Sequence, residues 1–192
     1  GVEILKPLVR ASRILVLDEP TAVLTPQESE SLFATLARFT AAGLALIFIS
    51  HKLDEVVRVS DRIVVLKQGR AVLEIAARDT TRSKLAEAMV GSLAQAGSGA
   101  RGDAGGAAAQ AGPALGELAG VSGLGSGHSS LHDIDLQVRP PEVMAIAGVA
   151  GNGQQALAAL LSGEIVARAG VVKVAGRALP ARPRDWIDAG IA

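Results

Sequence analysis

The stretch Arg13-Ile-Leu-Val-Leu-Asp18-Glu19-Pro20 decides the fold, because it joins a short apolar run to two adjacent carboxylates. Residues 14–17 are too few for a buried helix and predict a strand covered on both faces, as in a parallel sheet. Pro20 has no amide hydrogen to donate and ends the strand. Because successive strand side chains point to opposite faces, we expect Asp18 and Glu19 to do different jobs, one holding a metal and the other facing a reacting water.

Composition limits the classes of partner. The 19 Lys and Arg residues equal the 19 Asp and Glu residues, so the zero net charge gives no support for nucleic acid as a bulk partner. The chain has no cysteine, which excludes a disulfide framework and a thiolate metal site. The longest apolar runs, such as residues 44–49, fall far short of the about 20 residues that span a bilayer. Function must therefore depend on specific sites.

A helix is predicted directly after the first strand. Thr25-Pro26-Gln27-Glu28 places Thr at the N-cap, Pro at the first helical position and Glu three residues after the cap. Apolar residues at helical spacing then form one buried face, and Gly43 ends the helix. The members of this face are Leu32, Phe33, Leu36 and Phe39.

A second buried strand, residues 44–49, ends at Ser50-His51. A strand, a helix and a strand with short connections make a right-handed crossover between parallel neighbours, so both strands end at one edge of the sheet. Ligands of open α/β sheets bind at the carboxyl ends of the strands. We therefore expect Asp18, Glu19 and His51 to converge there.

The rest of the first half continues this α/β pattern up to a boundary. Helices are expected over residues 2–10, near 53–57 and over 81–90, and a hairpin over 62–75 has Gly69 in its turn. From residue 91 to residue 113 periodicity gives way to Ala, Gly, Ser and Gln, which predicts a flexible linker between two units.

The second unit contains a glycine loop between a strand and a helix. Strands are expected over residues 115–121, 131–138, 143–147, 171–174 and 176–179, with helices over 156–161 and 185–189. The strand at 143–147 opens into Gly148-Val-Ala-Gly151-Asn152-Gly153-Gln154-Gln155. A glycine-rich turn before a helix aims several backbone amides at one point, a geometry that holds a phosphate group.

These residues resemble an ATP-binding cassette (ABC) ATPase. Residues 14–21 resemble its Walker B strand with the catalytic glutamate, and residues 48–52 resemble its switch-histidine strand. Residues 61–70 resemble the strand and turn that follow, and residues 2–6 the helix after the signature sequence. Residues 148–154 are similar to the variant phosphate loop of tandem-cassette ATPases that energise simple-sugar and nucleoside importers.

The resemblance implies an α/β, P-loop NTPase-like fold with antiparallel subdomain strands. Residues 1–90 would be the C-terminal half of a first cassette, residues 91–113 the linker, and residues 114–192 the N-terminal part of a second cassette. The chain would thus be an internal piece of a longer subunit, inactive on its own. The partners implied are transmembrane permease subunits, a second cassette that closes over ATP and, indirectly, a substrate-binding protein, at the cytoplasmic face of the membrane.

The resemblance also implies roles for the site residues, with ATP and Mg²⁺ as cofactors. Asp18 would accept from the water shell of Mg²⁺, Glu19 would polarise the attacking water, and His51 would contact the γ-phosphate. In the second unit the nucleotide-binding residues would be Gly148, Gly151, Asn152, Gly153, Gln154 and Gln155.

The sequence departs from the family pattern in the glycine loop. Gln154 and Gln155 stand where Lys and Ser or Thr are expected, so the loop lacks the lysine charge and the hydroxyl that binds magnesium. Thr25 stands where the family has an aspartate, and it has a structural role as the N-cap.

Other readings of these patterns stay open. The chain could be a non-catalytic nucleotide-binding or structural module, or another P-loop ATPase such as a DNA-repair or chromosome-condensation relative. The glycine loop could also be only a tight turn, whereas its spacing and the lack of an acidic residue after residues 171–174 disfavour a dinucleotide fingerprint. His128 and His132 lie in or beside a Gly/Ser loop, where a structural or solvent-facing role is favoured over ligation.

Overall fold

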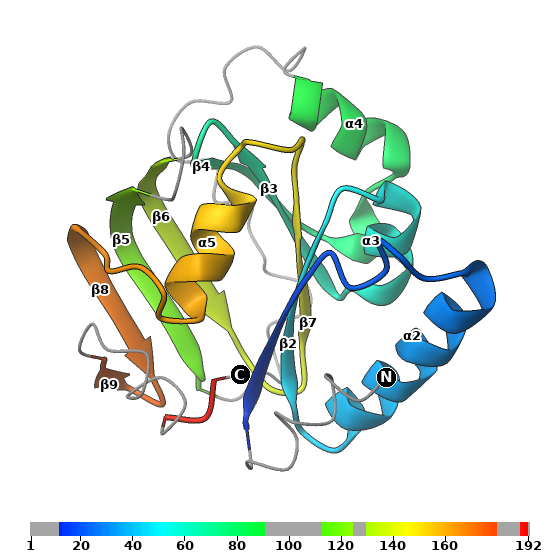
Figure 1. Cartoon of the computed structure of the whole chain (residues 1–192), viewed down its shortest axis with the longest axis horizontal. Coiled ribbons are helices and arrows are strands. Elements are labelled where there is room, and N and C mark those ends of the chain that lie inside the picture. The colour runs from blue at the N-terminus through cyan, green and yellow to red at the C-terminus, as the bar shows by residue number, and fades with distance from the viewer. Residues whose placement is uncertain (1–11, 91–112, 125–129, 180–188, 192) are drawn as a thin grey trace.

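The computed structural model describes residues 12–90, 113–124, 130–179 and 189–191. These residues form a mixed α/β fold with a five-stranded sheet, sheet A, and a four-stranded sheet, sheet B (Figure 1). In spatial order the strands of sheet A are β1 (Ile14–Asp18), β2 (Ala45–Ser50), β7 (Val143–Ala147), β3 (Arg62–Lys67) and β4 (Arg70–Ala76).

Four of the five strands of sheet A run in the same direction. β1 pairs with β2, β2 with β7 and β7 with β3, all in parallel, whereas β4 returns antiparallel to β3. The predicted parallel neighbours and the hairpin with Gly69 in its turn are therefore confirmed. The carboxyl ends of β1, β2, β7 and β3 lie at one edge of the sheet, where ligand sites of such sheets form.

Strand β7 comes from the half of the chain after residue 113 but lies between two strands of the other half. All five of its residues are buried, as expected for a central strand. The sequence pattern predicts two separate units and gives no sign of this pairing. The assignment of residues 1–90 and 114–192 to two cassettes of a longer protein stays a prediction.

Polar contacts also join the two halves at the amino ends of these strands. The Arg62 Nε donates to Glu142 Oε1 at 2.7 Å, and both side chains are largely buried. The backbone amide of Val143 donates to Asp61 Oδ2 at 2.8 Å. Burial raises the cost of breaking such an ion pair, because the remaining charge would be left without a partner.

Sheet B and helix α5 (Gln154–Leu161) cover one face of sheet A (Figure 1). The spatial order of sheet B is β6 (Ser130–Val138), β5 (Gly116–Leu124), β8 (Ala169–Val174) and β9 (Arg177–Ala178), and every pair is antiparallel. One hydrophobic cluster fills the space between the sheets and takes residues from both halves of the chain, including Ile47, Ile134 and Leu157. The predicted strands and helix of this region are confirmed within a few residues.

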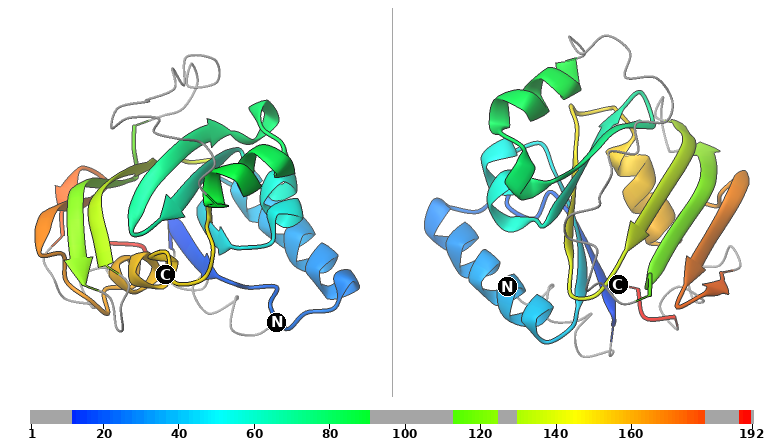
Figure 2. Two further views of the ribbon diagram at one scale, coloured as in Figure 1. Left: turned by 90° about the horizontal axis from the view of Figure 1, so that it is seen from above. Right: turned by 180° about the vertical axis from the view of Figure 1, so that it is seen from behind.

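The opposite face of sheet A packs against helices α2 (Pro26–Ala41), α3 (Leu53–Val59) and α4 (Arg82–Val90), as the second view in Figure 2 shows. A short 3₁₀ turn, η1 (Ala77–Asp79), connects β4 to α4. Phe33 of α2 meets Phe48 of β2 edge to face with ring centroids 5.9 Å apart, a favoured aromatic geometry.

The start of α2 confirms the capping signals of the sequence. The backbone amide of Glu28 donates to the Thr25 hydroxyl at 3.3 Å, and the backbone amide of Thr25 donates to Glu28 Oε2 at 2.8 Å. These two bonds are a capping box, and Pro26 occupies the first helical position. These bonds fix the start of α2, where the short connection from β1 ends.

Several predicted features lie outside the described residues. They are the helix over residues 2–10, the linker apart from Pro113, His128, and all but Ala189 of the helix over 185–189. Within the described part of the chain, no helix is long and apolar enough to cross a membrane.

Candidate functional site

Glu19 and His51 meet at the carboxyl ends of β1 and β2. The His51 Nδ1 lies 2.7 Å from Glu19 Oε1, and the backbone amide of His51 donates to the same oxygen at 3.1 Å. The convergence of these two side chains, separated by 32 positions in the sequence, is as the parallel crossover predicts. Both side chains are partly exposed to solvent.

The alternation of side chains along a strand does not extend to Glu19, because β1 ends one residue before it. β1 ends at Asp18, and Glu19 adopts a left-handed backbone conformation with φ of 45°. This conformation is uncommon for a residue with a side chain. The different environments of Asp18 and Glu19 therefore do not follow from strand alternation, which was the wrong reason for expecting them.

The two carboxylates interact through their charges. Partial burial and, second, the neighbouring charge of Glu19 raise the pKa of Asp18 above its usual 3.8. Glu19 Oε2 is buried and has no hydrogen-bond partner among the described residues. An unpartnered carboxylate oxygen next to a second carboxylate fits a hard cation such as Mg²⁺.

The described residues contain no group of three or more His, Cys, Asp or Glu side chains that could hold a metal ion. Magnesium in nucleotide enzymes is commonly held by one or two carboxylates together with phosphate oxygens and waters. The residues present therefore fit a Mg²⁺ ion that takes most of its ligands from other groups.

A network that no sequence motif indicates fixes the loop after Glu19. The hydroxyl of Thr21, which is fully buried, donates to Glu55 Oε2 at 2.6 Å. The Lys52 Nζ donates to the Thr21 carbonyl oxygen at 2.8 Å and lies 3.5 Å from Glu55 Oε1. Lys52 follows His51 directly, so this network connects the loop after Glu19 to the segment that carries His51.

The glycine loop, residues 148–153, follows β7 at the same edge of sheet A. Ser50 of β2 pairs with Ala147 of β7, so His51 and Gly148 leave the sheet from neighbouring positions. Two hydrogen bonds join the loop to the β3–β4 turn of the first half: the Gln68 amide donates to Asn152 Oδ1 at 2.8 Å and the Gly69 amide donates to the Asn152 carbonyl oxygen at 2.9 Å. Such long-range contacts leave no local sequence pattern.

The side chain of Gln154 turns into this loop. Its Nε2 donates to the Val149 carbonyl oxygen at 3.0 Å, and the residue is only 8% exposed. Gln155, by contrast, is exposed in the first turn of α5. The side-chain amide of Gln154 therefore lies within the glycine turn, against Gly148.

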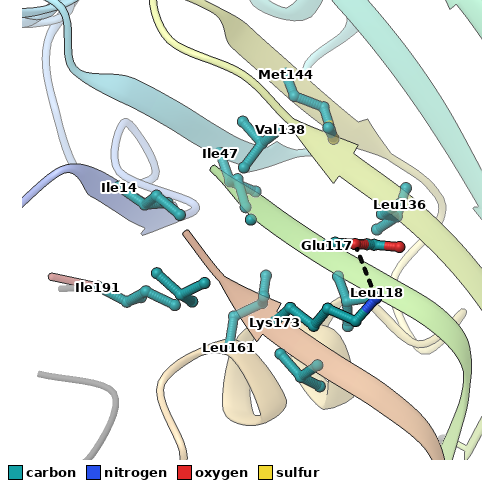
Figure 3. A pocket seen from close by; sticks show the side chains of 13 residues that line it. Ile14, Ile47, Glu117, Leu118, Leu136, Val138, Met144, Leu161, Lys173 and Ile191 are labelled. Carbon is teal, nitrogen blue, oxygen red and sulfur yellow. Dashed lines mark hydrogen bonds and ion pairs between the residues drawn. The ribbon is translucent and has the colours of Figure 1, made fainter. Parts of the chain in front are cut away.

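The described residues also enclose a cavity of about 20 Å³ between the two sheets, away from these strand ends (Figure 3). Aliphatic side chains line it, among them Ile14, Leu136 and Met144, and the Glu117–Lys173 ion pair lies at its side. A cavity of this volume holds about one water molecule, whereas ligand pockets measure several hundred Å³. It is a packing defect of the core.

Comparison with known proteins identifies relatives along nearly the whole chain. A glucose import ATP-binding protein of Haloferax volcanii is 44% identical over an alignment of 192 positions that covers 99% of this chain. A ribose import ATP-binding protein of Rubrobacter xylanophilus is 35% identical and a nucleoside import ATP-binding protein of Lactococcus lactis 36% identical, each over 99% of the chain. The chain is a homologue of import ATP-binding proteins. This confirms the resemblance to the ATPases of ABC importers.

The chain spans 34–37% of the length of these relatives. No family model and no solved structure matches the chain. The homology implies a P-loop fold, in agreement with the mixed α/β architecture. His132, for which a structural or solvent-facing role is predicted, is exposed, and its backbone amide donates to the Gly69 carbonyl oxygen at 2.8 Å.

Proposed function

We propose that the chain is part of the ATP-hydrolysing subunit of an ABC importer for simple sugars or nucleosides. Residues 1–90 would form the C-terminal half of a first cassette and residues 114–192 the start of a second. Support comes from import ATP-binding proteins that match the chain from end to end while extending well beyond it. The wider subunit would act with transmembrane permeases, a second cassette and a substrate-binding protein at the cytoplasmic face of the membrane.

The contact between Glu19 and His51 carries the hydrolytic part of this proposal. Glu19 would take a proton from the attacking water, and His51 would hold Glu19 in place and reach the γ-phosphate. Asp18, whose raised pKa marks a partly desolvated carboxyl, would accept hydrogen bonds from the water shell of Mg²⁺. The magnesium ion would neutralise charge on the phosphates.

A histidine pair in the chain allows a matched test. In a protein of the relatives' length that contains this chain, His51→Ala should lower ATP turnover by about 10²-fold or more, the usual range for a lost charge-stabilising or proton-transferring group. His132→Ala, at an exposed position of β6, should leave turnover unchanged. Steady-state phosphate release measures both. Equal turnover of the two variants would remove His51 from the mechanism.

A structural module without catalysis is a second candidate, and the filled glycine loop favours it. Both candidates expect the present chain alone to show no Mg²⁺-dependent ATP hydrolysis. They differ in the longer protein, where only the first expects hydrolysis that depends on Glu19 and His51.

A further inference from the structure

We propose that the side chain of Gln154 closes the glycine loop against phosphate groups, as an internal occupant that must leave before a nucleotide can enter. This inference rests on the proposed function, because closure matters only in a loop that belongs to a nucleotide-binding protein. The ligand class that it excludes is the diphosphate or triphosphate group of a nucleotide.

The carbonyl oxygen of Val149 is the centre of the closed form. It accepts from Gln154 Nε2 at 3.0 Å, from Asn152 Nδ2 at 3.0 Å and from the Asn152 backbone amide at 3.2 Å. Three donors on one oxygen hold the two ends of the loop together. A phosphate group that entered the loop would have to displace the first of them.

The space that Gln154 occupies exists because Gly148 has no side chain. A Cβ atom at Gly148 would lie 2.3 Å from Gln154 Nε2 and 2.7 Å from the Leu66 carbonyl oxygen. The amide of Gln154 therefore lies directly against the first glycine of the loop. With only 8% of the residue exposed, water has little access to the hydrogen bond and does not compete for it.

The outer side of the loop is fastened as well. Asn152 accepts from the amides of Gln68 and Gly69 on the β3–β4 turn, and a Cβ atom at Gly153 would lie 3.0 Å from Gly69 Cα. The loop is therefore held between its own Gln154 and a turn of the other half of the chain. Rotation of Gln154 is the smallest movement that frees the interior.

No positive charge in the loop compensates for the hydrogen bond that is lost when Gln154 rotates out. The sequence from Gly148 to Gln155 contains no cationic side chain, and the amide of Gln154 is neutral. An ammonium group gains a charge-assisted bond when it exchanges a carbonyl for a phosphate, whereas an amide exchanges one ordinary hydrogen bond for a somewhat stronger one. Gln154 thus favours the closed form more than a lysine at the same position would.

Calorimetric titration of ADP into the present chain tests the proposal. Removal of the internal hydrogen bond in Gln154→Ala should tighten ADP binding about two- to tenfold relative to the unchanged chain. Gln154→Lys, which restores the charge, should bind more tightly still. Gln27→Ala makes the same chemical change at an exposed position of α2, on the other face of sheet A, and should bind ADP as the unchanged chain does.

The outcomes separate the two proposals. If Gln154→Lys gains affinity while Gln154→Ala binds no better than the unchanged chain, closure by Gln154 is refuted and the loop remains a nucleotide site. If no variant binds ADP, the nucleotide role proposed for this region fails instead.

Hydrogen exchange of the loop amides gives a readout that needs no nucleotide. Exchange of the Asn152 amide should quicken in Gln154→Ala and in Gln154→Met, which keeps the side-chain length but has no donor. The Met variant also serves if the Ala variant does not fold. Unchanged exchange in a folded variant would overturn the closure.

Discussion

The strand ends at β1 and β2 differ from the strand end at β7, although all three lie at one edge of the same sheet. At β1 and β2, two carboxylates and a histidine are exposed or partly exposed to solvent, and one carboxylate oxygen has no partner among the described residues. At β7, the polar side chains of Asn152 and Gln154 are committed to hydrogen bonds within the protein. The ends of β1 and β2 therefore offer polar groups to a ligand. The polar side chains after β7 already form hydrogen bonds within the protein.

This difference indicates that position in the fold does not by itself assign a function. A glycine turn between a strand and a helix offers backbone amides wherever it occurs. Its ability to hold phosphate also depends on whether the next side chain brings a charge or fills the space. Here Gln154 fills the space, while Glu19 leaves an oxygen unused.

The largest effect is expected from Glu19→Gln in a protein of the relatives' length. Loss of the proton acceptor should lower ATP turnover by about 10²- to 10⁴-fold while nucleotide binding persists. Turnover is measured by phosphate release and binding by equilibrium titration. Glu87→Gln, an exposed site on α4, is the matched control. Normal turnover in Glu19→Gln would mean that the β1 end is no more catalytic than the β7 end.

A substitution that creates a cavity at β7 tests whether the two halves of the chain unfold as one unit. Ile146 is fully buried at the centre of sheet A, so Ile146→Ala should lower the free energy of unfolding by about 2–5 kcal/mol. Urea unfolding followed by circular dichroism should still show one transition. Val72→Ala, at a 41% exposed position of β4, should change stability far less. Two transitions, one with the original midpoint, would mean that the halves fold separately.

The sequence predicted most elements because their signals are local. The capping box at Thr25 and Glu28, the strand before Asp18 and the hairpin turn at Gly69 each depend on residues close together in the chain. The approach of His51 to Glu19 was predictable from the rule for parallel crossovers.

Two other features could not be predicted in this way. The insertion of β7 between β2 and β3 depends on pairing across more than 75 residues, and any buried aliphatic strand satisfies the same pattern. The inward turn of Gln154 depends on a side-chain torsion and on the space beside Gly148. Its identity was visible in the sequence as a missing lysine, but its position was not.

The smallest effect is expected from Asp18→Asn, at the end of β1, on the thermal stability of the protein. Because burial and Glu19 raise the pKa of Asp18, the folded protein binds this proton more tightly than the unfolded chain, and the charged form destabilises the fold at neutral pH. Asp18→Asn should therefore raise Tm slightly at pH 7. The gain should shrink as the pH falls through the raised pKa and vanish below about 3.8, where Asp18 is protonated in both states.

Glu28→Gln provides a control of opposite sign for the Asp18 experiment. Hydrogen bonds from the backbone and hydroxyl of Thr25 lower the pKa of Glu28, so its charged form stabilises the fold above the usual pKa of 4.5. Its replacement should lower Tm at pH 7, and the loss should fade as the pH falls through the lowered pKa. Thermal unfolding across a pH series measures both variants. If Asp18→Asn lowers Tm at pH 7 as Glu28→Gln does, the charged form of Asp18 stabilises the fold. The end of β1 would then not lower the stability of the protein for the sake of function.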